Sequence, residues 1–401
     1  MQLKHKLNLH SYLAYILIPG LPFYYFINQK ISASISTYVY GSLLILLFLL
    51  SFYQNILREF RHGFPINKLF IIEILILLNI ILVLAYIGIL EKNLMLVFVT
   101  LYISKNIFAV NADLGFINAS NIITLSAFFC SIGVFLGVIE AFFFSSHWFN
   151  QVMDFDYPYS NGISETILIN GFFPSANGSA YSLGAGLAFM KFQNIFNYNL
   201  RKVLYVLFII TLIATKAKFA VLVAATYLGF MMFQKSAYKL LICYLCILAL
   251  FYLMLSHIII AIPGTYDYPS LHFRKILFSN GYVDFIIGNY GIFKLYSFEA
   301  MTSNIFIPFG LNRFIEIYSG RPHFMLGGLI ISGGISLACL IVSYIYFLLK
   351  KPLVIPILNS RSHALFLSIL FCFMVETFNW NFTNSFYFWG MIMAVQSLKD
   401  Y

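Results

Sequence analysis

Long apolar runs, separated by short polar segments, follow one another along almost the whole chain. A helix that spans a membrane needs about 20 mostly apolar residues, because lipid offers the backbone no hydrogen-bond partner and a helix satisfies its own N–H and C=O groups. We therefore predict an all-α fold, a polytopic membrane helix bundle of about 12 transmembrane helices. The predicted spans lie near residues 11–27, 37–53, 68–90, 93–111, 121–144, 176–193, 202–214, 217–234, 238–261, 324–349, 361–376 and 384–398.

The composition supports a membrane protein. Apolar residues make up 61% of the chain and charged residues 9%, whereas a typical soluble domain has roughly 25% charged residues. No separate soluble domain stands out, so we predict one integral membrane domain over residues 1–401.

The distribution of basic residues predicts the orientation, because cytoplasmic loops of membrane proteins carry an excess of Lys and Arg. With the N-terminus inside, most of the 24 basic residues fall on the cytoplasmic side, whereas residues 145–173, on the outside, contain none. The net charge of +10 is then mainly this inner belt, which includes Lys105, and needs no nucleic-acid partner. We expect a bacterial inner (cytoplasmic) membrane protein with both termini in the cytoplasm.

One outside segment is much longer than a connection between spans needs. Residues 263–322 form this predicted periplasmic loop, between spans 9 and 10, and their sequence is aromatic and apolar rather than linker-like. The spacing of apolar positions over 271–287 predicts a helix in the membrane interface, and 297–320 predicts further short helices. Loops of this length are usually functional, so we expect this one to cover a cavity.

Three segments resemble a known family in both their order and their topology. They are GFFPSANGSAYSLGAGLAF (171–189), TLIATKAKFAVLVAATYLG (211–229), and the FGLNRF element (309–314) followed by His323 at the start of a glycine-rich span. Together they are similar to the O-antigen polymerase and O-antigen ligase superfamily of membrane glycosyltransferases. Leu168, Lys218 and Phe324 stand where family members often have Arg, Arg and Asn. The fuller pattern is more typical of ligases, so these departures favour a polymerase.

The resemblance implies transfer of a glycan from undecaprenyl pyrophosphate to a sugar hydroxyl on a second lipid-linked saccharide. Such a leaving group needs fixed cations, for which the planar fork of arginine is well suited. The attacking hydroxyl needs a base with a pKa near 7, which histidine supplies. His323 matches the family histidine and is our candidate catalytic base, beside the candidate pyrophosphate-binding residues Arg321, Arg274, Lys218, Arg313 and Lys216. The implied partners are donor and acceptor lipid-linked oligosaccharides, a chain-length regulator and a flippase.

Simpler interpretations of these residues stay open. His323 can cap a helix, Arg321 can anchor lipid headgroups, and Arg313 can pair with Glu316 three residues on. Lys216 and Lys218 can reflect a misplaced boundary of the short seventh span, and His272 is an alternative base. We predict no metal and no cofactor, because the Asp154–Asp156 pair is isolated and lies outside.

Two other functions remain candidates. A ligase would transfer finished polymer to lipid A core, and a flippase or other transporter would move the lipid-linked oligosaccharide across the membrane. Transporters tend to place charged groups near the membrane midplane and to be built from matching halves. Here Glu73, Lys105 and Glu140 lie toward span ends, and the long loop has no counterpart in the N-terminal half. The polymerase is therefore the preferred hypothesis.

Overall fold

The computed structural model describes most of the chain outside residues 228–324. The described residues are 9–30, 33–61, 68–87, 92–108, 115–143, 148–155, 164–173, 175–215, 217, 219–220, 223–224, 226–227, 310, 325–353, 361–375 and 382–398. The structural statements below concern these residues.

Helices dominate the described chain, as the hydropathy pattern predicts. Each predicted span from 11–27 to 202–214, and each from 324–349 onward, coincides with one helix. The helices are α1 Leu9–Lys30, α2 Ala33–Arg61, α3 Lys68–Ile87, α4 Lys92–Phe108, α5 Phe116–Phe143, α6 Ala176–Phe189, α7 Tyr198–Ala214, α14 Met325–Leu353, α15 Arg361–Val375 and α16 Phe382–Ser397.

Four helical stretches of the described chain are long and apolar enough to cross a membrane. They are Tyr38–Leu57, Lys68–Tyr86, Phe116–Phe143 and Gly328–Lys350, and Leu94–Phe108 is a shorter apolar helix. The helical fold is therefore confirmed, and the four apolar helices support a membrane protein. The count of 12 spans and the loop at 263–322 stay predictions, because spans 8 and 9 and this loop fall mainly outside the described residues.

Side-chain hydrogen bonds place the starts of α1 and α5 on the same side of the bundle as the second halves of α2 and α4. His10, at the start of α1, lies 2.9 Å from the Ser51 hydroxyl in the second half of α2 and 3.1 Å from Asn106 near the end of α4. Tyr15 donates to Asn118 at the start of α5, at 3.0 Å. We call this side of the bundle the His10 end.

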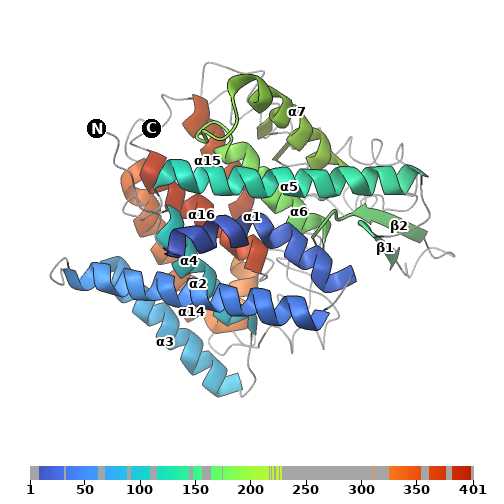
Figure 1. The fold of residues 1–401 in the computed structure, drawn as a ribbon. Helices are drawn as coiled ribbons and strands as arrows, with labels where there is room; N and C mark the ends of the chain where they lie inside the picture. Colours follow the sequence, from blue (N-terminus) through green and yellow to red (C-terminus); the bar gives the residue numbers. More distant parts are fainter. Residues whose placement is uncertain are drawn as a thin grey trace, which may run out of the picture.

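A two-stranded antiparallel sheet, which hydropathy does not predict, lies at the other end of α5, and we call this side the hairpin end (Figure 1). Strand β1 covers Asn150–Phe155 and β2 covers Ser164–Ile169, with Asn150 opposite Ile169 and Phe155 opposite Ser164. The strands fall within residues 145–173, the stretch without Lys or Arg that we predict to lie outside. The fold is thus a helix bundle with one small hairpin.

The centre of the bundle contains α6, which is buried on all sides. Its sequence, ANGSAYSLGAGLAF, is rich in small residues, and every described position except Asn177 is buried. Small residues let helix backbones approach closely in membranes. A Cβ atom on Gly184 would lie 3.0 Å from the Phe219 ring. The glycine-rich half of the first family-like segment therefore serves helix packing.

Candidate functional site

The six candidate site residues, His323, Arg321, Arg274, Lys218, Arg313 and Lys216, lie outside the described residues. Described residues lie within four positions of each of them except Arg274. Thr215 and Ala217 flank Lys216, Gly310 precedes Arg313 by three residues, and α14 begins two residues after His323. These neighbours show which side of the bundle each segment approaches.

The segment with Lys216 and Lys218 follows a helix that ends on the hairpin side. Asn194, just before α7, is bonded through both its backbone and its side chain to Asn121 in the first turns of α5, at 2.9 and 2.8 Å. α7 therefore starts at the His10 end. Its 17 residues extend about 25 Å, so Thr215 and Ala217 lie toward the hairpin end.

The part of α14 that follows Gly334 runs toward the His10 end. The Tyr344 hydroxyl, in the second half of α14, donates to the Glu73 carboxylate at 2.7 Å, and Glu73 lies in the second turn of α3. Asn79, six residues further along α3, donates to the Ser336 hydroxyl at 2.7 Å. The Gly334 end of this part of α14 therefore points away from the His10 end.

α14 is interrupted three residues after its contact with Gly310. Gly334 has φ 74° and ψ 174°, which breaks the helix into two parts. Gly310, buried and with φ 85°, donates its N–H to the carbonyl of Ile331 at 3.0 Å. Both backbone conformations favour glycine. Gly310, the described residue of the FGLNRF element, is therefore bonded to the first part of α14.

The GFFPSANG element forms a tight turn between β2 and α6. Gly171 has φ 61°, and a Cβ atom there would lie 2.7 Å from the backbone nitrogen of Val134 in α5. Phe172 packs against Gly133. The Ser175 side chain accepts from the N–H of Gly178 and caps α6. Glycine is required at 171 both by the positive φ and by the close approach to α5.

Glu140, which the sequence analysis did not select, fixes the other connection at this end. Its two carboxylate oxygens accept the backbone N–H groups of Trp148 and Phe149, at 2.6 and 2.8 Å. The Phe149 carbonyl in turn accepts the N–H groups of Asn170 and Gly171, at 3.1 and 2.9 Å. One carboxylate, 4% exposed, thereby links α5 to both ends of the hairpin. Its signal in the sequence is an acidic residue near the end of an apolar run.

Aromatic rings surround this junction. Phe26 of α1 stacks on Phe149, with centroids 5.2 Å apart and an interplanar angle of 8°. Phe172 contacts both of these rings edge-on and lies 4.9 Å from Phe23. At the hairpin end, aromatic rings therefore pack together beside the backbone segment that the Glu140 carboxylate binds.

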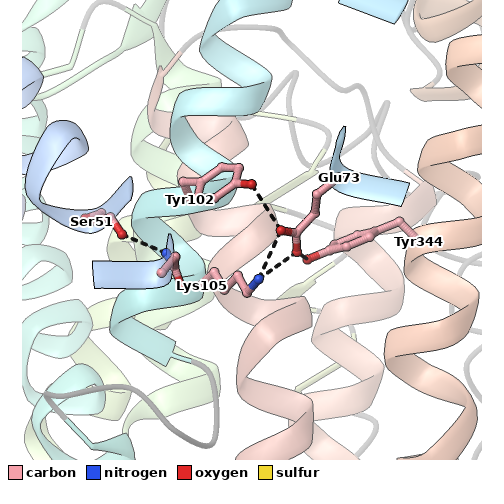
Figure 2. A network of polar contacts seen from close by, with 6 residues as sticks. Ser51, Glu73, Tyr102, Lys105 and Tyr344 are labelled. Atoms are coloured by element: carbon pink, nitrogen blue, oxygen red, sulfur yellow. Dashed lines mark hydrogen bonds and ion pairs between the residues drawn. The ribbon is translucent and has the colours of Figure 1, made fainter. Parts of the chain in front are cut away.

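A second polar cluster lies at the His10 end (Figure 2). The Glu73 carboxylate, fully buried, pairs with the Lys105 ammonium at 2.8 Å and accepts from the hydroxyls of Tyr102 and Tyr344. Figure 2 shows these side chains reaching Glu73 from other helices. The Lys105 side chain is only 17% exposed. Lys105 thus has an internal partner in addition to its predicted place in the inner belt.

Comparison with known proteins gives no family assignment. No family model matches the sequence, and no curated protein matches it. Within the described residues, no group of three or more His, Cys, Asp or Glu side chains could hold a metal ion. The described part of the hairpin end can offer a rigid aromatic surface and backbone hydrogen-bonding groups. Acid–base chemistry there would depend on the candidate residues outside the described chain.

Proposed function

We propose that the protein polymerises lipid-linked polysaccharide repeat units. The growing glycan leaves undecaprenyl pyrophosphate and is joined to a sugar hydroxyl of an incoming lipid-linked repeat, at the periplasmic face of the inner membrane. The observation that carries this proposal is the presence of three family-like segments, in the family's order, in a helical membrane-type protein.

The arrangement of the described elements supports this proposal. The turn at Gly171 lies at the hairpin end, and Thr215 and Ala217, which flank Lys216, lie toward the same side. Gly310, three residues before Arg313, is bonded to Ile331 in the first part of α14.

In this reaction His323 takes the proton from the acceptor hydroxyl as its oxygen attacks the anomeric carbon of the donor sugar. The bond to the carrier breaks, and its electron pair stays on the pyrophosphate. Arg321, Arg274 and Lys218, with Arg313 and Lys216, stabilise the charge that grows on this leaving group. Base and cations together replace a metal, so a chelator should leave the rate unchanged.

The lipid profile of a strain that lacks the protein tests this function. A polymerase predicts that single repeat units accumulate on lipid A core and that longer chains disappear. Full-length polymer left on the carrier lipid would indicate the ligase instead. Repeat units trapped on the cytoplasmic side would indicate the flippase. An unchanged glycan profile would contradict all three functions.

A transporter is the second candidate, because one observation favours it. Ionisable side chains inside transmembrane segments often mark transport pathways, and Glu73 and Lys105 form such a pair between α3 and α4. Transport of lipid-linked oligosaccharide into vesicles should then be lost in Glu73→Gln and retained in His323→Ala. The polymerase predicts the reverse for glycan transfer per folded molecule.

A further inference from the structure

Trp148 presents a half-exposed ring on a fixed backbone at the hairpin end. Trp148 is 51% exposed, and its backbone N–H donates to the Glu140 carboxylate at 2.6 Å. The indole lies 6.3 Å from the ring of Phe26, which stacks on Phe149. A ring held in this way loses little conformational entropy when a ligand covers it.

The sequence of the segment that carries this ring limits the kind of ligand. Residues 145–173 contain Asp154, Asp156 and Glu165 but no Lys or Arg, so the segment repels phosphate groups. Carboxylates accept hydrogen bonds from hydroxyl groups, and an aromatic face offers an apolar contact to the C–H groups of a ligand. A polyhydroxylated ring without negative charge fits both properties. Lys30, a cation, lies in the last turn of α1. The binding test below therefore includes a variant that removes it.

We propose that Trp148 is a stacking platform for a sugar ring of the lipid-linked saccharide and that Glu140 is the positioning residue that holds it. The identity of this saccharide rests on the proposed function. Saccharide binding at Trp148 and glycan transfer are separate measurements, so either one can fail without the other.

Binding to the purified full-length protein in lipid nanodiscs tests the platform. The probe is undecaprenyl-linked repeat unit extracted from cells that lack the protein, and undecaprenyl phosphate without sugar is the control ligand. The signal is the difference in tryptophan fluorescence between the wild type and Trp148→Phe, because the chain has only two other tryptophans. The saccharide should quench this signal and the sugar-free lipid should not.

Variants then separate a platform from a general membrane anchor. Trp148→Ala should weaken saccharide binding about 2- to 10-fold, and Trp148→Phe should retain most of the affinity. Glu140→Gln keeps one acceptor for the two N–H groups, so it should weaken binding less than Trp148→Ala and make Trp148 more accessible to acrylamide. Tyr198→Ala, which removes a 68% exposed aromatic residue near the His10 end, and Lys30→Ala should bind as the wild type does.

Three results would overturn the platform. They are wild-type affinity in Trp148→Ala, an equal loss in Tyr198→Ala, and equal quenching by the sugar-free lipid. If the saccharide binds as described but the wild type does not polymerise it, the proposed function fails while the platform stands.

Discussion

Two buried glutamates bind their partners in opposite ways. Glu73, at the His10 end, is bound by side chains from α4 and α14, whose positions in the sequence lie 29 to 271 residues away. Glu140, at the hairpin end, accepts main-chain N–H groups only 8 and 9 residues away. The first contact holds helices together, and the second shapes a connection. The comparison indicates that Glu73 stabilises the packing of helices at the His10 end, whereas Glu140 fixes the backbone that carries Trp148 and Phe149 at the hairpin end.

The largest effect on stability should come from removing Glu73. Glu73→Ala leaves the Lys105 ammonium largely buried without this counter-charge, which typically costs about 3–5 kcal/mol. Unfolding of the purified protein in detergent, followed by circular dichroism, measures this loss. Glu73→Leu combined with Lys105→Met removes both charges and should recover most of it. Equal stability of the single variant and the wild type would show that the pair does not hold α3 to the bundle.

Removing one of the candidate cations should instead slow transfer and leave folding intact. One lost contact to the leaving group costs about 2–4 kcal/mol of transition-state stabilisation, or roughly 30- to 1000-fold in rate. We expect this for Lys218→Ala, Arg274→Ala and Arg321→Ala in a reconstituted assay. Arg321→Lys should recover only part of the rate, because an ammonium cannot make paired contacts. Wild-type polymer length in all three alanine variants would remove these residues from the site.

Gly171→Ala tests whether the junction at the hairpin end needs its backbone geometry. The left-handed conformation costs a non-glycine residue about 1–2 kcal/mol, and the new Cβ would also lie 2.7 Å from the Val134 nitrogen. We expect a total loss of about 2–3 kcal/mol in the free energy of unfolding. Gly41→Ala in α2 is the matched control, because nothing lies within 4 Å of its Cβ position. A similar result for both variants would mean that the turn tolerates a side chain.

Hydropathy predicts the helices well, because the burial of a long apolar run depends on a local pattern. It gives no information about which charged residues meet. Lys105 counts toward the predicted inner belt in the sequence, and only the packing of α3 against α4 and α14 gives it Glu73 as a partner.

At the hairpin end, the family resemblance identifies Gly171 but not the role of Glu140. A carboxylate that binds backbone N–H groups needs no basic residue nearby, so no charge pattern marks it. The hairpin itself is missed because its strands are short and mixed in polarity. For His323 and the five cations the sequence remains the only guide.

A pH profile should distinguish the two ends by a smaller effect. As the general base, His323 must be neutral, so transfer should fall as the pH drops below its pKa, which is about 6.5 in an unperturbed histidine. At pH 5.5 the rate should be about tenfold below its plateau. A nearby Arg321 would lower this pKa and shift the profile to more acidic values. His10→Gln should keep the same profile. A flat rate between pH 5 and 8 would exclude a histidine base.

The most direct test measures transfer rate and thermal stability on the same purified samples of His323→Ala and Glu73→Ala. We expect His323→Ala to lose about 100- to 10,000-fold in transfer rate while it unfolds at the wild-type temperature. We expect Glu73→Ala to unfold at a lower temperature and to keep near wild-type transfer per folded molecule. The opposite pattern, with transfer lost in Glu73→Ala and retained in His323→Ala, would contradict the placement of the chemistry on the hairpin side.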